Sequence, residues 1–243
     1  MRKMKDFTVD YRPHRFNAVW GNADIKRIIK GWILKDIRPN SIVLVGRCGI
    51  GKSTFGKLIA QRFNCHLSPN NEPEPCEQCD SCVDCILHPK EFDLTNLSVD
   101  EVRYRLRNAI NLFNPETTFY WDEMQRWYMK NQEIFLKPIE EAERLHHIFS
   151  TTDIKAIDEA ILSRSVVLEI FPPSPDEMVA GLTPIVAECS IKISEAVLRK
   201  LIKMSRNTPR KCLSAFNVFA TMEVDITEET LESDLIRKML LSE

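Results

Sequence analysis

One nine-residue segment, residues 46–54, constrains this chain more than any other part of its sequence. It reads Gly-Arg-Cys-Gly-Ile-Gly-Lys-Ser-Thr and fits the pattern G-x-x-x-x-G-K-[ST] of phosphate-binding loops. A short apolar run rich in β-branched residues, residues 41–45, precedes it, and apolar residues at helical spacing, residues 54–60, follow it. Strand, glycine loop and helix are the order that such a loop requires.

The residue types in this segment explain how it would hold a nucleotide. Glycines let backbone N–H groups close around phosphate oxygens, and the following helix N-terminus adds positive potential. Lys52 is expected to reach the β- and γ-phosphates of ATP, and the Ser53 hydroxyl is expected to bind Mg²⁺. A glycine turn before a core helix is the alternative, but three of the chain's 7 glycines lie here, which favours nucleotide binding. The expected nucleotide-binding residues of the loop are Gly46, Arg47, Cys48, Gly49, Ile50, Gly51, Lys52, Ser53 and Thr54.

Composition and charge exclude several other classes of protein. The 243 residues are 44% hydrophobic and 28% charged, which predicts a soluble globular protein of one large or two smaller domains. No apolar run reaches membrane-spanning length, and the first residues lack the apolar region of a signal peptide, so we expect a cytoplasmic location without a membrane partner. Because the net charge is only −2, any contact with nucleic acid must use a local basic patch.

The spacing of the cysteines predicts a metal site. Five of the 8 cysteines lie within residues 65–85, at positions 65, 76, 79, 82 and 85. Stacked Cys-x-x-Cys spacings let thiolates converge on one tetrahedral ion, and Zn²⁺ is the metal that structural four-cysteine sites favour. Three prolines, at positions 69, 73 and 75, predict that this insertion is not helical. An iron–sulfur cluster and free thiols remain open as alternatives.

A pair of acidic residues follows a second apolar segment. Residues 117–121 read as a strand, rich in aromatic residues, and Asp122 and Glu123 come directly after it. Beside a phosphate-binding loop, Asp122 is expected to hold Mg²⁺ from the second side of the site, and Glu123 to polarise the attacking water. The alternative is an ordinary strand followed by an acidic turn.

The order of these motifs resembles the clamp-loader ATPase subunits of DNA polymerases, which are members of the AAA+ family. Residues 11–22 are similar to the Tyr-Arg-Pro-x-x-Phe-x-x-Val-x-Gly-Gln/Asn opening of those subunits, which borders the adenine, so the resemblance implies nucleotide contacts for Tyr11 and Val19. The Asp-Glu pair is similar to the family's Walker B motif. Thr152 takes the sensor-1 position near the γ-phosphate, and Arg210 takes the sensor-2 position, where an arginine touches the phosphates.

The resemblance implies that the active site is shared between subunits. Ser163-Arg164-Ser165 is similar to the family's Ser-Arg-Cys motif, with serine in place of cysteine. In the family, this arginine reaches the γ-phosphate of the neighbouring subunit as an arginine finger. An arginine that caps the carbonyls at a helix end is the alternative for Arg164.

The resemblance also implies DNA contacts for three basic residues. Arg103 and Arg107 lie four residues apart on one side of a predicted helix over residues 99–110, where the family's helix faces DNA. For both arginines, a solvated helix face that pairs with neighbouring acidic residues is the alternative. Lys137 matches another basic, DNA-facing position of the family, in a predicted helix over residues 131–143 that Pro138 should kink.

For the metal site, the resemblance implies a particular set of four ligands. Bacterial gamma/tau-type clamp-loader subunits carry a zinc module with one lone cysteine and then a Cys-x-x-Cys-x-x-Cys run. That pattern maps onto Cys65, Cys76, Cys79 and Cys82. Cys85 is then an extra cysteine, so whether Cys65 or Cys85 supplies the fourth thiolate stays open. His66 and His88 are expected to be surface residues.

The sequence therefore predicts an α/β fold of the AAA+ type, with a P-loop domain whose parallel sheet is flanked by helices. This domain is expected over residues 1–171, with the zinc-binding insertion at about residues 65–85. A small all-helical lid domain is expected over residues 175–243, with helices at 175–189, 194–205, 210–221 and 227–240. The nucleotide should bind at the carboxyl ends of the strands.

The function that the resemblance implies is ATP-driven loading of a sliding clamp onto primed DNA during replication. The expected cofactors are ATP, Mg²⁺ and Zn²⁺, and the expected partners are other clamp-loader subunits, the sliding clamp and primer–template DNA. The location would be the cytoplasm, or the host cytoplasm for a viral protein. A nucleotide-binding scaffold without turnover and another AAA+ motor, such as a helicase loader, are the alternatives. Family subunits continue into a helical collar domain, so this chain is expected either to be shortened or to assemble through other surfaces.

Overall fold

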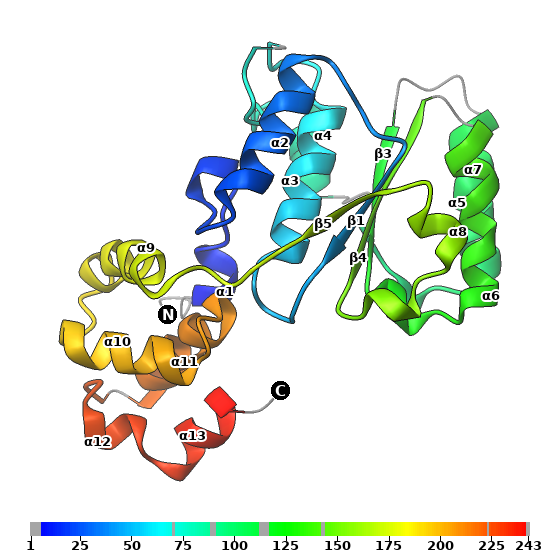
Figure 1. Ribbon diagram of the computed structural model, residues 1–243. Helices are drawn as coiled ribbons and strands as arrows, with labels where there is room; N and C mark the ends of the chain where they lie inside the picture. Colours follow the sequence, from blue (N-terminus) through cyan, green and yellow to red (C-terminus); the bar gives the residue numbers. More distant parts are fainter. Residues whose placement is uncertain are drawn as a thin grey trace. The chain divides into compact units, whose positions relative to one another are not determined.

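The computed structural model of the chain describes residues 6–69, 71–87, 91–111, 117–141, 144–222 and 224–241 (Figure 1). The chain divides into two compact units. A sheet unit comprises Ala23–Cys48 and Lys52–Ile170, and a helical unit comprises Met1–Asn22, Gly49–Gly51 and Phe171–Glu243. None of the helices in the described ranges has the length and apolar character that a membrane crossing requires.

The sheet unit contains five parallel strands in the order β2-β3-β4-β1-β5. The strands are β1 (Ser41–Val45), β2 (Glu91–Asp93), β3 (Thr117–Asp122), β4 (Leu145–Thr151) and β5 (Val166–Glu169). Val45 pairs with Thr151, and Trp121 pairs with Phe149, so the carboxyl ends of β1, β3 and β4 meet at one edge of the sheet. The predicted parallel α/β fold is confirmed.

Helices lie on both faces of this sheet (Figure 1). On one face lie α2 (Ala23–Leu34) and α3 (Lys52–Asn64), and on the other lie α5 (Val99–Asn111), α7 (Leu136–Glu141) and α8 (Glu159–Leu162). The shorter elements are α4 (Asp80–Leu87), α6 (Met129–Gln132) and the 3₁₀ turns η2 (Leu94–Asn96), η3 (Met124–Arg126), η4 (Glu133–Phe135) and η5 (Ile154–Ala156). Cover on both faces is what a parallel sheet requires, because its strands are apolar on both sides.

The face under α5 and α7 holds an aromatic core. The rings of Trp121 and Phe149 each lie 5.0 Å from the ring of Phe135, and all three side chains are fully buried. His147 lies among these rings, and its Nδ1 accepts a hydrogen bond of 3.1 Å from the indole N–H of Trp121. Burial lowers the pKa of His147 to about 3, so its imidazole is neutral and packs as a core ring. Phe119 and Trp121 of β3 thus belong to the hydrophobic core on this face of the sheet.

The opposite face of the sheet brings α3 very close to β3. Gly56 of α3 lies against the ring of Tyr120, where a Cβ atom would come within 2.3 Å of the tyrosine Cε2 atom. Only glycine permits this approach of the helix to the strand, because any side chain would overlap the ring. Tyr120 is fully buried beneath the helix.

The helical unit is a bundle of short helices around its own apolar core. Its elements are α1 (Phe7–Asp10), the 3₁₀ turn η1 (Phe16–Ala18), α9 (Pro175–Glu188), α10 (Glu195–Met204), α11 (Pro209–Met222), α12 (Glu228–Leu231) and α13 (Asp234–Leu241). A capping box between Ser174 and Glu177 starts α9, with Pro175 at its first position. Leu182, Leu201 and Phe216 are among its fully buried residues.

The N-terminal segment groups with this helical unit, whereas the sequence predicted it as part of the nucleotide-binding domain. Phe7 is buried in the core of the helical unit, with its ring 6.0 Å from that of Phe216. Trp20 lies so close to α9 that a Cβ atom at Gly181 would come within 2.1 Å of its Cε2 atom. Apolar burial against distant residues therefore decides where this segment packs, and its own sequence does not show that partner.

Two other elements differ from their predictions because of local chemistry. The cysteine-rich insertion contains the helix α4, since all three of its prolines precede Asp80 and none interrupts the helix. The alternating pattern of residues 92–98 predicts a strand over that range, but the strand ends at Asp93, whose side chain accepts the backbone N–H of Thr95 and so starts η2. Both differences are turns or helices that begin at an aspartate, a residue that favours such starts.

Two predicted long helices are each divided. The helix expected over residues 131–143 is α6, η4 and α7, within the part of that range that the structure describes. Pro138 lacks the N–H that would bond to the carbonyl of Ile134, so the disruption falls one turn before the proline. The helix expected over residues 227–240 is split into α12 and α13, where the Ser233 hydroxyl donates to the carbonyl of Thr230.

Candidate functional site

The phosphate-binding loop follows β1, and α3 begins within it. Gly49 and Gly51 have φ values of +77° and +115°, conformations that favour glycine. Lys52 is the first residue of α3; its side chain is buried, and its Nζ atom donates a hydrogen bond of 2.9 Å to the carbonyl of Arg47. The loop thus turns back on itself and holds the lysine in place at its own base.

The two expected magnesium ligands contact each other. The Ser53 hydroxyl in the first turn of α3 donates a hydrogen bond of 3.1 Å to Oδ2 of Asp122, at the end of β3. The Ser150 hydroxyl of β4 donates to Oδ1 of the same carboxylate. A hydroxyl and a carboxylate are oxygen ligands of the kind that Mg²⁺ prefers. This pair lies at the carboxyl ends of the strands, the edge where a nucleotide was expected.

Glu123 is held by a side chain that sequence reasoning missed. Its backbone is left-handed, with φ of +59°, which turns the chain at the end of β3. The amide of Gln125 donates to Oε2 of Glu123 at 2.5 Å, and the carbonyl oxygen of the same amide accepts the backbone N–H of Thr152 at 3.2 Å. Gln125 therefore links the expected water-polarising acid to the expected sensor-1 residue. Its position two residues after the acidic pair was the only sequence signal.

Arg164 lies exposed just after α8 and is already engaged in an ion pair. Its Nε atom lies 2.5 Å from Oε1 of Glu140, and its Nη1 atom donates to the carbonyl of Ala160 at 2.9 Å. Within the part of the chain that the structure describes, none of its hydrogen bonds and ion pairs reaches the phosphate-binding loop.

The other expected nucleotide contacts lie in the helical unit. The Tyr11 hydroxyl shares a hydrogen bond of 2.9 Å with the Cys189 thiol, and Val19 is buried. Arg210, at the start of α11, donates its backbone N–H to the carbonyl of Gly49 at 3.4 Å. Contacts of Tyr11, Val19 and the Arg210 side chain with a nucleotide stay predictions.

The four cysteines Cys65, Cys76, Cys79 and Cys82 come together in space. Their sulfur atoms all lie within 4.8 Å of one another, and the Cys65–Cys79 and Cys76–Cys82 distances are both 3.8 Å. Four sulfur atoms at about 2.3 Å from one tetrahedral ion would be about 3.8 Å apart. The donor set and its spacing therefore fit zinc.

The structure describes some of the other residues that the sequence places near the cluster, Cys85, His66 and His88. Cys85 lies in α4, but its side chain is outside the described part, and His88 falls outside the described residues. His66 is exposed, as expected. The described thiols complete a four-ligand set that includes Cys65.

The surroundings of the cluster suit a charged metal–thiolate centre. Burial raises the pKa of Cys82; burial also opposes ionisation of Cys65, but hydrogen bonds from Ser68 lower its pKa to about 5. These two thiols therefore do not ionise alike, and a cation bound in the cluster would stabilise the thiolate form of its ligands. Arg62, a buried residue of α3, donates to the carbonyls of Pro69 and Glu72 at 3.0 and 2.9 Å and places its positive charge near Cys65 and Cys82. Sequence reasoning missed Arg62, although an arginine among apolar helix positions was a signal.

The basic residues expected to face DNA line one groove. A cavity of about 860 Å³ lies between α5 and the α6–α7 segment, and Arg103, Arg107 and Lys137 all line it. Lys130, which the sequence analysis did not single out, lines it too. Two of these basic residues also form ion pairs with acidic residues of their own helix: Arg103 lies 2.9 Å from Asp100, and Lys137 lies 3.5 Å from Glu141.

The sheet order and the placement of the motifs define a P-loop domain with the AAA+ fold. Among solved structures, the chain is similar to the RuvB Holliday junction branch migration motor of Thermotoga maritima, with a TM-score of 0.64 and 14% identity over 97% of this chain and 73% of that chain. A mutant form of the same RuvB protein gives a TM-score of 0.68 with 15% identity, over 96% and 73% of the two chains. No protein-family model matches the chain.

Sequence relatives come from one branch of this class. The chain is similar to the gamma and gamma/tau subunits of DNA polymerase III. It is 32% identical to the gamma/tau subunit of Mycoplasma pneumoniae over 212 residues, 84% of this chain and 31% of that protein. It is 25% identical to the gamma subunit of Buchnera aphidicola subsp. Baizongia pistaciae over 234 residues, 93% of this chain and 63% of that protein. The chain thus spans less than two thirds of the length of these relatives.

Proposed function

We propose that this chain is an ATP-driven clamp-loader subunit, which opens a sliding clamp and loads it onto primed DNA during replication. The names of its relatives, DNA polymerase III subunits gamma and gamma/tau, support the replication role. The observation that carries the ATPase assignment is the hydrogen bond between Ser53 and Asp122, beside Lys52 and Glu123. A subunit of this class works in an assembly in the cytoplasm with other subunits, the clamp and primer–template DNA.

The chain's residues have distinct roles in the proposed hydrolysis. Lys52 neutralises charge on the β- and γ-phosphates, and Ser53 and Asp122 would hold Mg²⁺, which would supply further charge neutralisation there. Glu123, oriented by Gln125, accepts a proton from the water that attacks the γ-phosphorus. Thr152 lies next to the same amide and is placed to sense whether the γ-phosphate is present. The bond from the γ-phosphorus to the bridging oxygen breaks, and ADP and phosphate result.

Zinc is proposed as the structural cofactor of the four-cysteine cluster, which fits a tetrahedral ion. We expect one zinc per chain by elemental analysis of the native protein. Cys76→Ser should lose the metal and destabilise the insertion, because the segment between α3 and α4 has little apolar core of its own. Cys48→Ser, which removes an exposed thiol outside the cluster, is the matched control and should retain zinc. Native protein without zinc, in which all four thiols react freely, would contradict this assignment.

The groove between α5 and α6–α7 is proposed as the DNA contact, since it gathers four basic side chains.

The test of the overall function is the ATPase rate with and without primed DNA and a sliding clamp. Replacing Arg103, Arg107 and Lys137 together by glutamine should leave the basal rate unchanged and remove DNA stimulation. It should also reduce the slope of log affinity against log salt by about 0.9 for each lost phosphate contact. Arg27→Gln, on the exposed face of α2, is the charge control. A triple variant with normal DNA stimulation would exclude the groove.

A nucleotide-binding scaffold without turnover is the second candidate. The ion pair between Arg164 and Glu140 is the observation that favours it, because an arginine that keeps this partner during the reaction would not contact the phosphate of a neighbouring subunit. The complete set of Lys52, Asp122 and Glu123 argues for turnover. Nucleotide binding without hydrolysis under assembling conditions would decide for the scaffold.

A further inference from the structure

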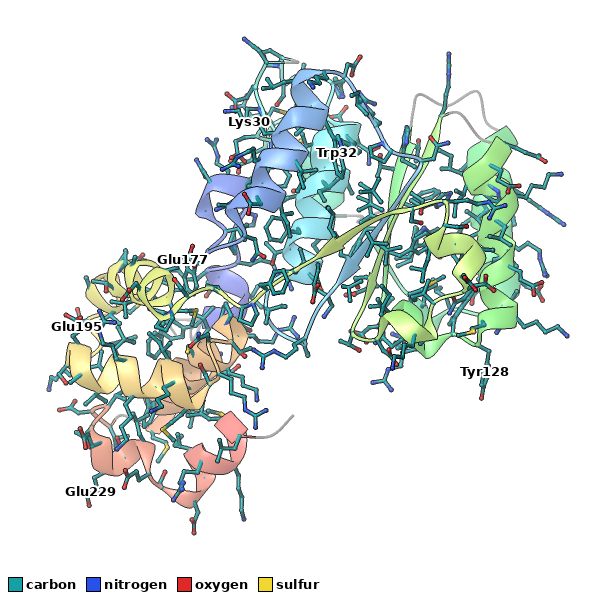
Figure 2. The ribbon with its side chains drawn as sticks, in the orientation of Figure 1. Lys30, Trp32, Tyr128, Glu177, Glu195 and Glu229 are labelled. Atoms are coloured by element: carbon teal, nitrogen blue, oxygen red, sulfur yellow. The ribbon has the colours of Figure 1, made fainter. Side chains whose placement is uncertain are left out.

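The hydroxyl of Tyr120 is a buried polar group without a role in the reaction described above. The residue is 1% exposed, and its Oη atom has no hydrogen-bond partner among the described residues. A buried hydroxyl that makes no hydrogen bond is destabilising and uncommon in native proteins, so it calls for a specific explanation. Figure 2 shows that side chains fill the space between α3 and the strands.

The position of Tyr120 places this hydroxyl at the expected magnesium site. Tyr120 and Asp122 are two residues apart on β3, so both side chains lie on the face of the sheet that α3 covers. The side chains of Ser53, Ser150 and Asp122 lie beside the phenol. A tyrosine hydroxyl carries its proton at neutral pH, so it can act as a hydrogen-bond donor here.

The helix opposite has a matching feature. Ser53 and Gly56 lie three residues apart on α3, so both face β3. The tyrosine ring can lie under the helix because Gly56 has no side chain. A Cβ atom at this position would lie only 2.3 Å from the ring. An aliphatic residue at position 120 would fill this space without placing a polar group there. The glycine and the tyrosine thus together bring a hydroxyl to the base of the site.

We propose that Tyr120 is a positioning residue of the magnesium site, which donates a hydrogen bond to the Asp122 carboxylate when Mg²⁺ and ATP are bound. The inference rests on the proposed ATPase function. Asp122 accepts hydrogen bonds from Ser53 and Ser150, and among the described residues the tyrosine hydroxyl is the remaining donor beside it that has no partner. A carboxylate that holds a metal is commonly oriented by such outer donors.

The test is the Mg²⁺ dependence of ATP binding to Tyr120→Phe, measured by calorimetry. The Mg²⁺ concentration for half-maximal ATP binding should rise roughly tenfold, the lower end of the effect of removing an outer donor of a metal ligand. ADP binding in EDTA should be unchanged. The melting temperature of the nucleotide-free protein should not fall, because only an unpaired hydroxyl is lost. Tyr104→Phe, on the exposed surface of α5, is the matched control and should behave as the wild type.

A double variant shows whether the tyrosine acts through the aspartate. In an Asp122→Asn background, Tyr120→Phe should have little further effect on the Mg²⁺ dependence, because the charged acceptor is already gone. An unchanged Mg²⁺ dependence in Tyr120→Phe, or equal weakening of ADP binding in EDTA, would overturn the inference while leaving the ATPase function intact. Wild-type protein that binds no ATP with Mg²⁺ would overturn both.

Discussion

Glu123→Gln is expected to bind ATP with Mg²⁺ as tightly as the wild type and to lose turnover by about 10²–10⁴-fold, the usual contribution of a general base. The amide cannot accept a proton from the attacking water, whereas Ser53 and Asp122 remain in contact and can still hold the cation. Because Gln125 binds Oε2 of Glu123, the substituted amide is also held in a similar place. Binding is measured by calorimetry and turnover by phosphate release.

Lys52→Ala is the contrasting variant for this experiment. It removes a buried positive charge from the phosphate-binding loop, so it should weaken ATP binding itself. Equal losses of ATP affinity in Glu123→Gln and Lys52→Ala would contradict the separate roles given to the two residues. Wild-type turnover in Glu123→Gln would rule out Glu123 as the base.

Arg164→Ala is expected to lower turnover by about 10³–10⁵-fold with ATP binding largely retained, which is the usual effect of removing an arginine finger, the role that its sequence motif predicts. The guanidinium group is exposed and paired with Glu140, so it can exchange this partner for a phosphate presented by a neighbouring subunit. Turnover is measured under conditions that promote assembly, with clamp and primed DNA present. Arg199→Ala, an exposed arginine with two acidic partners in the helical unit, is the matched control and should retain activity.

Mixing the variants tests whether the arginine acts between subunits. Arg164→Ala and Lys52→Ala should each be nearly inactive alone. Their mixture should recover part of the activity, because some interfaces then pair an intact loop with an intact arginine. An arginine that serves its own subunit would give no recovery, and wild-type turnover in Arg164→Ala would show that the arginine has no catalytic part.

Sequence reasoning reached the parts of the molecule that are encoded by short patterns. The strand before the phosphate-binding loop, the start of α3 and the convergence of Cys76, Cys79 and Cys82 follow from spacings within a few residues of each other. The inclusion of Cys65 was implied only by the family resemblance. The acid pair at the end of β3 could be placed at the same edge of the sheet, because parallel strands bring their carboxyl ends together.

The remaining features depend on partners far away in the sequence. Gly56 and Tyr120 are 64 positions apart in numbering, and neither residue alone indicates the other. Gln125 acquires its role only because β4 ends beside it and presents the N–H of Thr152. The burial of Phe7 against α11 could not be read from the polar segment around it. Tertiary packing determines each of these contacts, and the local propensities of the residues do not indicate them.

The helix α3 fixes the distance between the four-cysteine site and the nucleotide site. It carries Lys52 and Ser53 in its first turn and Arg62 in its last turn, and Cys65 directly follows its last residue, Asn64. A helix of 13 residues is about 20 Å long, so the two sites stand at opposite ends of one rigid rod. Cobalt placed in the four-cysteine site would be a paramagnetic centre at a fixed distance from the nucleotide. Relaxation of nuclei on bound ATP could then report the geometry of the phosphates directly in solution.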